Sequence, residues 1–173
     1  MKKRFWKTAL LLVIALLILG GVWYARSVGV ETLFPGLEPD QISVTVLDFD
    51  GSKQADRSLT LLKGTPEFDE LWGKVQALRF RRAPTSVLVQ ALPFLAGTSS
   101  SQSKTLEEDD IGHLYLDFFQ GNDPSTAWVG ELSFRIDSWA YQDLDHGVTL
   151  PLRMKDSQAI GQEMAHAFWE RAE

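Results

Sequence analysis

An uncharged apolar run near the N-terminus constrains this chain more than any other feature. It extends over 18 residues, 8–25, between Lys7 and Arg26. As an α-helix, a run of this length is about 27 Å long, close to the ~30 Å hydrocarbon core of a bilayer. A helix with no polar face belongs in lipid or in the centre of a larger domain than 173 residues can build. We therefore predict a single transmembrane helix at residues 8–25, in contact with the lipid bilayer.

The residues that flank this run predict its orientation. The bases that precede it are Lys2, Lys3, Arg4 and Lys7. After it, Arg26 is followed by Glu31, Glu38 and Asp40. Because basic flanks stay in the cytoplasm, we expect a cytoplasmic N-terminus and an extracytoplasmic C-terminal domain. Aromatic residues at both ends, Trp6 and Trp23-Tyr24, suit the two headgroup layers.

A cleaved export signal is the alternative interpretation, and it would give a secreted protein. Ala25-Arg26-Ser27 has the small-x-small pattern of a cleavage site. The apolar run, however, exceeds the usual signal core of ~7 to 15 residues, and the bulky Trp23 and Tyr24 lie next to the site. We therefore favour a retained signal anchor in the cell membrane.

The charge of the remaining chain limits its partners. All 23 acidic residues lie after residue 26, together with 12 of the 17 bases, which leaves that part with a net charge of −11. Nucleic-acid binding needs a basic surface, so we expect no nucleic-acid partner. Cysteine is absent, which excludes disulfides and thiolate metal sites. An exported chain without disulfides fits a bacterial cell surface.

The chain divides into three parts. Residues 1–26 form the basic tip and the anchor. Residues 27–41 show no periodicity and contain Gly29, Pro35, Gly36 and Pro39, so we predict a linker. Residues 42–173, roughly 130 residues, suffice for one compact domain.

Local patterns within residues 42–173 predict an α+β fold. Alternation of apolar and polar residues predicts strands at 42–47, 113–118 and 127–136. The short apolar segment 59–62 is expected to close a hairpin with the first strand, and further strands are expected at 87–92, 139–141 and 148–152, with a polar loop at 97–110. On the strand at 127–136, Trp128 and Gly130 are expected to face inward with Leu132 and Phe134. Helices are predicted after a Thr65 cap, up to Leu78, and at 157–171 after Asp156 or Ser157. Together these elements predict a mainly antiparallel sheet with two helices on one face.

Residues 44–52, VTVLDFDGS, resemble the first motif of haloacid dehalogenase-like phosphatases, an apolar strand followed by D-x-D-G-S/T. The resemblance implies that Asp48 is the nucleophile and Asp50 the general acid, beside Mg²⁺. The alternative is a β-hairpin with an Asp50-Gly51 turn. We adopt the hairpin, because a strand rather than a helix is expected to follow the motif.

Two further groups are candidates for metal or anion binding. The acidic run 107–110 with His113 nearby offers oxygen and nitrogen ligands, but no calcium-loop pattern is complete, so we predict a solvated loop with no metal or cofactor. The bases Arg79, Arg81 and Arg82 suit capture of carboxylates or phosphates on a partner. Pairing with the domain's own acids is the interpretation we favour.

The histidines and tryptophans show no arrangement typical of a site. His113, His146 and His166 are scattered over a strand, a turn and a helix, without a catalytic motif. The tryptophans after the anchor are expected to pack in the core or on the sheet: Trp72, Trp128, Trp139 and Trp169. No residue is therefore nominated as catalytic or cofactor-binding.

The sequence thus predicts a membrane-anchored extracytoplasmic module that binds an unidentified protein or small molecule and is not an enzyme. Two alternatives remain open. One is a Mg²⁺-dependent phosphatase that uses Asp48 and Asp50. The other is a small structural subunit of a membrane complex, which acts through its helix in the bilayer.

Overall fold

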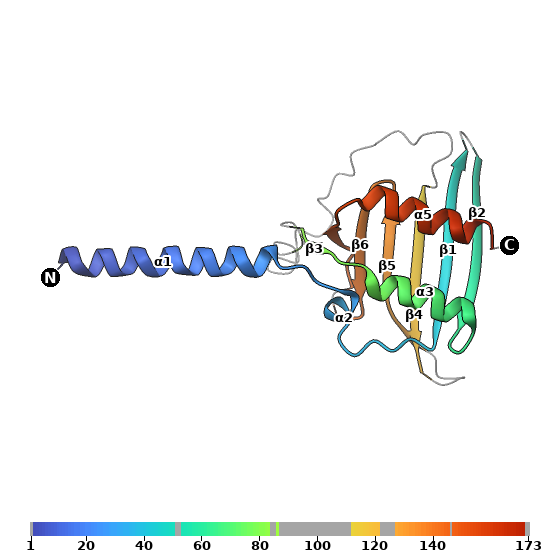
Figure 1. Cartoon of the computed structure of the whole chain (residues 1–173), viewed down its shortest axis with the longest axis horizontal. Coiled ribbons are helices and arrows are strands. Elements are labelled where there is room, and N and C mark those ends of the chain that lie inside the picture. The colour runs from blue at the N-terminus through green and yellow to red at the C-terminus, as the bar shows by residue number, and fades with distance from the viewer. Residues whose placement is uncertain are drawn as a thin grey trace.

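The computed structural model describes residues 2–50, 53–83, 86, 112–121, 127–145 and 147–171. Within these residues the chain forms seven strands and four helices (Figure 1). The strands are β1 (Gln41–Asp50), β2 (Lys53–Leu62), β3 (Arg81–Arg82), β4 (His113–Gln120), β5 (Ala127–Arg135), β6 (Ser138–Asp143) and β7 (Leu150–Arg153). The helices are α1 (Lys2–Ala25), α2 (Val30–Leu33), α3 (Pro66–Ala77) and α5 (Ser157–Trp169). The predicted α+β class is confirmed.

The described strands form one sheet in the order β2-β1-β4-β5-β6-β7-β3, and every neighbouring pair is antiparallel. The predicted hairpin at its start is confirmed, with Asp50 opposite Lys53. β2 is longer than predicted, because it begins at Lys53 rather than Leu59. As an edge strand, β2 tolerates polar residues that conceal its extent in the sequence.

Helices α3 and α5 lie across the same face of the sheet, as predicted (Figure 1). α3 begins where the sequence indicates, because the Thr65 hydroxyl accepts a hydrogen bond from the Phe68 amide at 3.3 Å. Asp156 is the N-cap of α5, but it makes no side-chain capping bond and has a φ of 55°. α5 approaches the sheet closely because Gly161 presents no side chain to the Phe134 ring.

The segment predicted as a linker is part of the folded domain. Val28 and Phe80 exchange two backbone hydrogen bonds of 2.8 Å. Residues of α2 and its C-cap are buried in the core: Val30, Leu33 and Phe34. Phe34 meets Phe118 edge-on with ring centroids 5.6 Å apart. The linker prediction for residues 27–41 is therefore wrong here, because a helix of one turn is too short to show a period in the sequence.

Other predictions fall partly or wholly on residues that are not described. The predicted strand at 87–92 and the predicted loop at 97–110 lie outside the described residues.

Strand β5 ends at Arg135, one residue before its predicted end, and Ile136 has a φ of 58° in the following turn.

Helix α1 extends away from the sheet and carries the N-terminus far from it (Figure 1). Among the described residues, no helix is long and apolar enough to cross a membrane. The predicted transmembrane span at residues 8–25 is therefore unsupported by this finding. The side chains of Thr8 and Ala25, at the two ends of that span, lie outside the described part of the structure.

Candidate functional site

The sheet face opposite α3 and α5 carries a line of polar and aromatic side chains on β4 and β5, which we call the polar row. Its members are His113, Tyr115, Asp117, Trp128, Glu131 and Arg135. The antiparallel register places Asp117 directly opposite Glu131, and His113 opposite Arg135. Each of these side chains except the exposed Arg135 is half-buried. The row therefore combines charge with partial exclusion of water.

A β-bulge brings Trp128 into the polar row. The register shifts between Phe118 and Phe119, so that Gly130 is paired with Phe118 and Trp128 with Phe119. The shift leaves Val129 unpaired and turns Trp128 onto the other face, where its indole N–H donates to Asp117 at 2.9 Å. The prediction that Trp128 faces inward is therefore wrong, because an inserted residue reverses the alternation beyond it.

Burial perturbs both carboxyl groups of the row. It raises the pKa of Asp117 above its ordinary value, an effect that the hydrogen bond from Trp128 partly opposes. Burial likewise raises the pKa of Glu131, and the negative charge of Asp117 raises it further. Perturbed carboxyl groups of this kind are typical of binding and catalytic sites. The pair suits hydrogen-bond donors or a cationic group on a partner.

At the other end of the row, His113 is held as a neutral ring. Burial and the nearby Arg135 both lower the pKa of His113. The guanidinium Nε of Arg135 lies 3.3 Å from Nε2 of His113. Because a guanidinium can only donate, Nε2 accepts, and the ring proton of neutral His113 belongs on Nδ1, which lies 3.5 Å from the Tyr115 hydroxyl.

The phosphatase-like motif lies in a different setting from the one that its resemblance implies. Asp48 is paired with Ala55 in β2, and β4 lies antiparallel on the other side of β1. The backbone of Asp48 and Asp50 belongs to β1, and their side chains lie outside the described part of the structure. A strand follows the motif instead of a helix, so the hairpin interpretation is confirmed.

The structure does not gather the remaining metal-ligand candidates. The acidic run 107–110 and His146 lie outside the described residues. His166 is exposed on α5, whereas His113 belongs to β4. Among the described residues, no three histidine or acidic side chains are grouped so that they could hold a metal ion.

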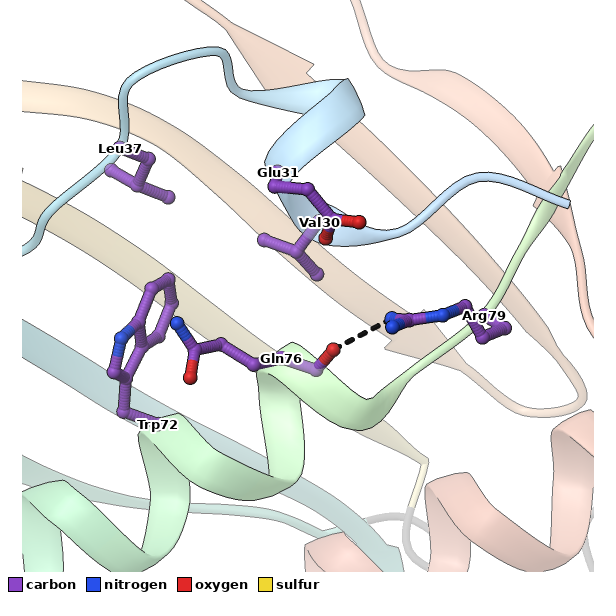
Figure 2. A pocket seen from close by; sticks show the side chains of 6 residues that line it. All are labelled: Val30, Glu31, Leu37, Trp72, Gln76 and Arg79. Atoms are coloured by element: carbon purple, nitrogen blue, oxygen red, sulfur yellow. Dashed lines mark hydrogen bonds between the residues drawn. The ribbon is translucent and has the colours of Figure 1, made fainter.

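A small cavity of about 270 Å³ lies between α2 and α3 (Figure 2). Its apolar wall includes Val30, Leu37 and Trp72. At one end, the Arg79 guanidinium donates to the carbonyl oxygens of Gln76 at 2.7 Å and Leu78 at 2.9 Å. Ligand pockets usually exceed about 300 Å³. We therefore regard this cavity as a packing gap in which Arg79 caps the end of α3.

A second hollow, of about 550 Å³, lies where α1 meets the sheet. Five bases line it, and we call them the basic cluster: Arg79, Arg81, Arg82, Arg153 and Lys155. The structure thus brings together the three arginines singled out in the sequence. It adds Arg153 and Lys155, which lie about 70 residues further along the chain, so no local signal in the sequence could have found them. Within the described residues, Lys155 alone of the five has an ion pair, with Asp156 at 4.0 Å, so the predicted pairing with the domain's own acids is not observed there.

The other tryptophans have mostly the packing roles predicted for them. Trp139 is fully buried, and Trp72 packs against Phe118 with centroids 5.9 Å apart. The Trp169 ring lies beneath the Arg57 guanidinium at 4.2 Å.

Comparisons with protein families, with curated proteins and with solved structures return no match for this chain.

Proposed function

We propose that the protein is a single-pass, membrane-anchored binding module with a cytoplasmic N-terminus. Residues 8–25 insert in the bilayer, and the α+β domain lies outside the cytoplasm. The observation that carries this proposal is the exposure of large apolar side chains around α1. Ten of them are between 42% and 70% exposed: Leu10, Leu11, Leu12, Val13, Ile14, Leu16, Leu17, Ile18, Leu19 and Val22.

The amount of exposed apolar surface supports insertion in lipid. Full burial of one such side chain is worth about 1.5 to 3 kcal/mol, so ten that are 42% to 70% exposed are worth on the order of 10 kcal/mol. These side chains do not belong to the described core, because the first residue along the chain that belongs to the core is Val28. Contiguous apolar patches of this size mark interaction or membrane surfaces.

The orientation rests on the asymmetry of charge. Basic residues precede the apolar run, whereas the domain after it is strongly acidic. Because the bases near a span decide its topology, the N-terminus belongs in the cytoplasm.

Within this assignment, the polar row is the binding surface of the domain. Asp117 and Glu131 are half-buried acceptors, and Trp128 and Tyr115 flank them with flat amphipathic rings. Such a surface recognises a partner that offers hydrogen-bond donors or positive charge. A binding role is favoured over phosphatase chemistry because the Asp48 motif lies in an antiparallel hairpin.

The anchor is tested by fractionation of cells that express the full chain. We expect the intact protein in membranes washed at alkaline pH, and cleavage of the domain by protease added outside spheroplasts. The variant Leu12→Lys/Leu16→Lys is expected in the soluble fraction. The matched control is Leu62→Lys/Leu144→Lys, which changes two exposed leucines of the domain and is expected to stay in the membrane.

Three outcomes contradict the anchor. The wild-type protein is extracted at alkaline pH, or the anchor variant remains in the membrane, or mass spectrometry finds a mature chain that begins near Ser27. The last result would instead support the cleaved export signal.

The binding surface is tested by cross-linking in membranes. The isosteric variant Asp117→Asn/Glu131→Gln is expected to lose its cross-linked partner by more than about tenfold, since charge-assisted hydrogen bonds contribute ~1.5 to 3 kcal/mol each. The control Glu67→Gln/Glu163→Gln changes two exposed acids on α3 and α5. Equal cross-linking by both variants would exclude the polar row.

A further inference from the structure

We propose that the basic cluster binds the phosphate headgroup of an anionic lipid at the membrane surface from which α1 emerges. This proposal rests on the anchor assigned above, because the anchor places the hollow at the bilayer surface. Arg81 and Arg82 of the cluster form β3, the edge strand at the end of the sheet nearest to α1 (Figure 1).

The cluster concentrates positive charge in an otherwise acidic domain. The lining of the hollow contains five bases and no acid. Arg79 donates to two carbonyl oxygens at the end of α3, and Lys155 lies 4.0 Å from Asp156 in an exposed ion pair. Arg81, Arg82 and Arg153 have no ion pair within the described residues. An anion is the ligand that such a lining selects.

The pairing of β3 with β7 gives a second, independent indication. Arg81 lies directly opposite Arg153, so the two exposed guanidinium groups share one face of the sheet. Like charges directly opposite each other destabilise a strand pair. Within the described residues, neither arginine has an ion pair that would offset this repulsion. A phosphate bound between them would remove it, since each guanidinium offers a fork of donors that matches phosphate oxygens.

Residues at the end of α1 connect the hollow to the membrane. The guanidinium of Arg82 lies 5.1 Å from the ring centroid of Trp23, one of the aromatic residues expected at the headgroup layer. Tyr24 lines the hollow, and its buried hydroxyl has no hydrogen-bond partner within the described residues. A phosphate in the hollow would offer this hydroxyl an acceptor.

A lipid headgroup fits this position better than a free anion. A base close to an anionic membrane surface strengthens association about fivefold, and the effect disappears within a Debye length of ~10 Å. The short connection between Ala25 and Val28 keeps the cluster close to the end of the anchor. The acidic remainder of the domain is repelled by the same lipids, so the cluster would also orient the domain on the membrane.

The test uses the full chain in neutral detergent micelles, titrated with short-chain phosphatidylglycerol, with phosphatidylcholine and with inorganic phosphate. Binding is measured by native mass spectrometry and by the shift of the unfolding temperature. We expect phosphatidylglycerol to bind at least tenfold more tightly than the other two probes. The variant Arg81→Gln/Arg153→Gln is expected to bind it about 25-fold more weakly, from two bases at about fivefold each.

The matched control is Lys63→Gln/Lys74→Gln, which removes two exposed bases outside the cluster and should leave the affinity unchanged. Without lipid, Arg81→Gln/Arg153→Gln should unfold at the wild-type temperature or above it, because a repulsion is lost. The single variant Lys155→Gln, at a side chain that is 93% exposed, should lose about fivefold and does not depend on the strand pair.

Equal affinity of wild type and cluster variant for phosphatidylglycerol would overturn the proposal. Inorganic phosphate that binds as tightly as the lipid would also overturn it, in favour of a soluble anion. Both results leave the anchor untouched, since micelle titration does not report whether α1 spans a bilayer. Conversely, failure of the fractionation experiment would refute the anchor whatever the cluster binds.

Discussion

The same substitution, glycine to alanine, is expected to have opposite effects on the two helices that cover the sheet. Gly73 in α3 is exposed, and an added Cβ would meet nothing within 4 Å. Gly161 in α5 is buried, and its added Cβ would overlap the ring of Phe134. Both positions are interior to their helices, so intrinsic helix propensity favours alanine equally at each.

The packing around Phe134 decides whether Gly161→Ala raises or lowers the free energy of unfolding. Alanine gains about 1 kcal/mol over glycine from helix propensity alone. Overpacking a core costs about 1 to 3 kcal/mol when the neighbour cannot move. Phe134 is fully buried and its ring lies 5.5 Å from that of Trp139, which is fully buried as well. We therefore expect Gly161→Ala to lower the free energy of unfolding by about 1 kcal/mol and Gly73→Ala to raise it by about as much.

The assay is thermal unfolding of the full chain in mild detergent, followed by near-ultraviolet circular dichroism. For a domain of this size, 1 kcal/mol corresponds to about 3 °C, so the two midpoints should differ by roughly 6 °C. If Gly161→Ala raises the midpoint as much as Gly73→Ala does, then α5 does not lie in contact with Phe134 and the reasoning is refuted.

Three further outcomes follow from named contacts. Burial raises the folded-state pKa of Asp117 and Glu131, so the folded protein favours their protonated, neutral form. These two groups therefore stabilise the fold at a pH below their ordinary pKa values of 3.8 and 4.5, and this stabilisation is lost as the pH rises through the raised values. Asp117→Asn/Glu131→Gln should therefore unfold at a higher temperature than wild type at pH 7 and lose that advantage near pH 3; a constant difference would contradict the assignment. Thr65→Ala should cost about 1 kcal/mol in urea unfolding through loss of the cap on Phe68, whereas Thr65→Ser should cost little. Trp139→Ala should cost about 3 to 5 kcal/mol in the same assay, and a loss below 1 kcal/mol would show that the ring is not a core residue.

Local patterns in the sequence were sufficient for most of the elements. Alternation along β4 places Leu114, Leu116 and Phe118 on the buried face, as the structure confirms. The Thr65 cap and the apolar period of α3 are likewise properties of neighbours along the chain. These signals are readable because a strand or a helix repeats its environment every few residues.

The candidate sites depended on contacts that no local pattern encodes. The residues of the polar row are aligned by the register of β4 against β5. One β-bulge in this pair places Trp128 on the face opposite to the predicted one. The basic cluster forms because β3 pairs with β7. This pairing places Arg153 beside Arg81, although the two residues are about 70 positions apart in the sequence. Helix α2 joined the core although its single turn has no visible period.

The sequence by itself determined the apolar segment, the asymmetry of charge around it and the periodicity of most strands and both sheet-covering helices. Only the tertiary structure decided which strand edges meet, which face each side chain occupies after the bulge, and which distant bases share one hollow. The physical reason is that periodicity records how each residue is buried relative to its chain neighbours. Strand pairing is instead selected by the packing of the whole sheet against its helices.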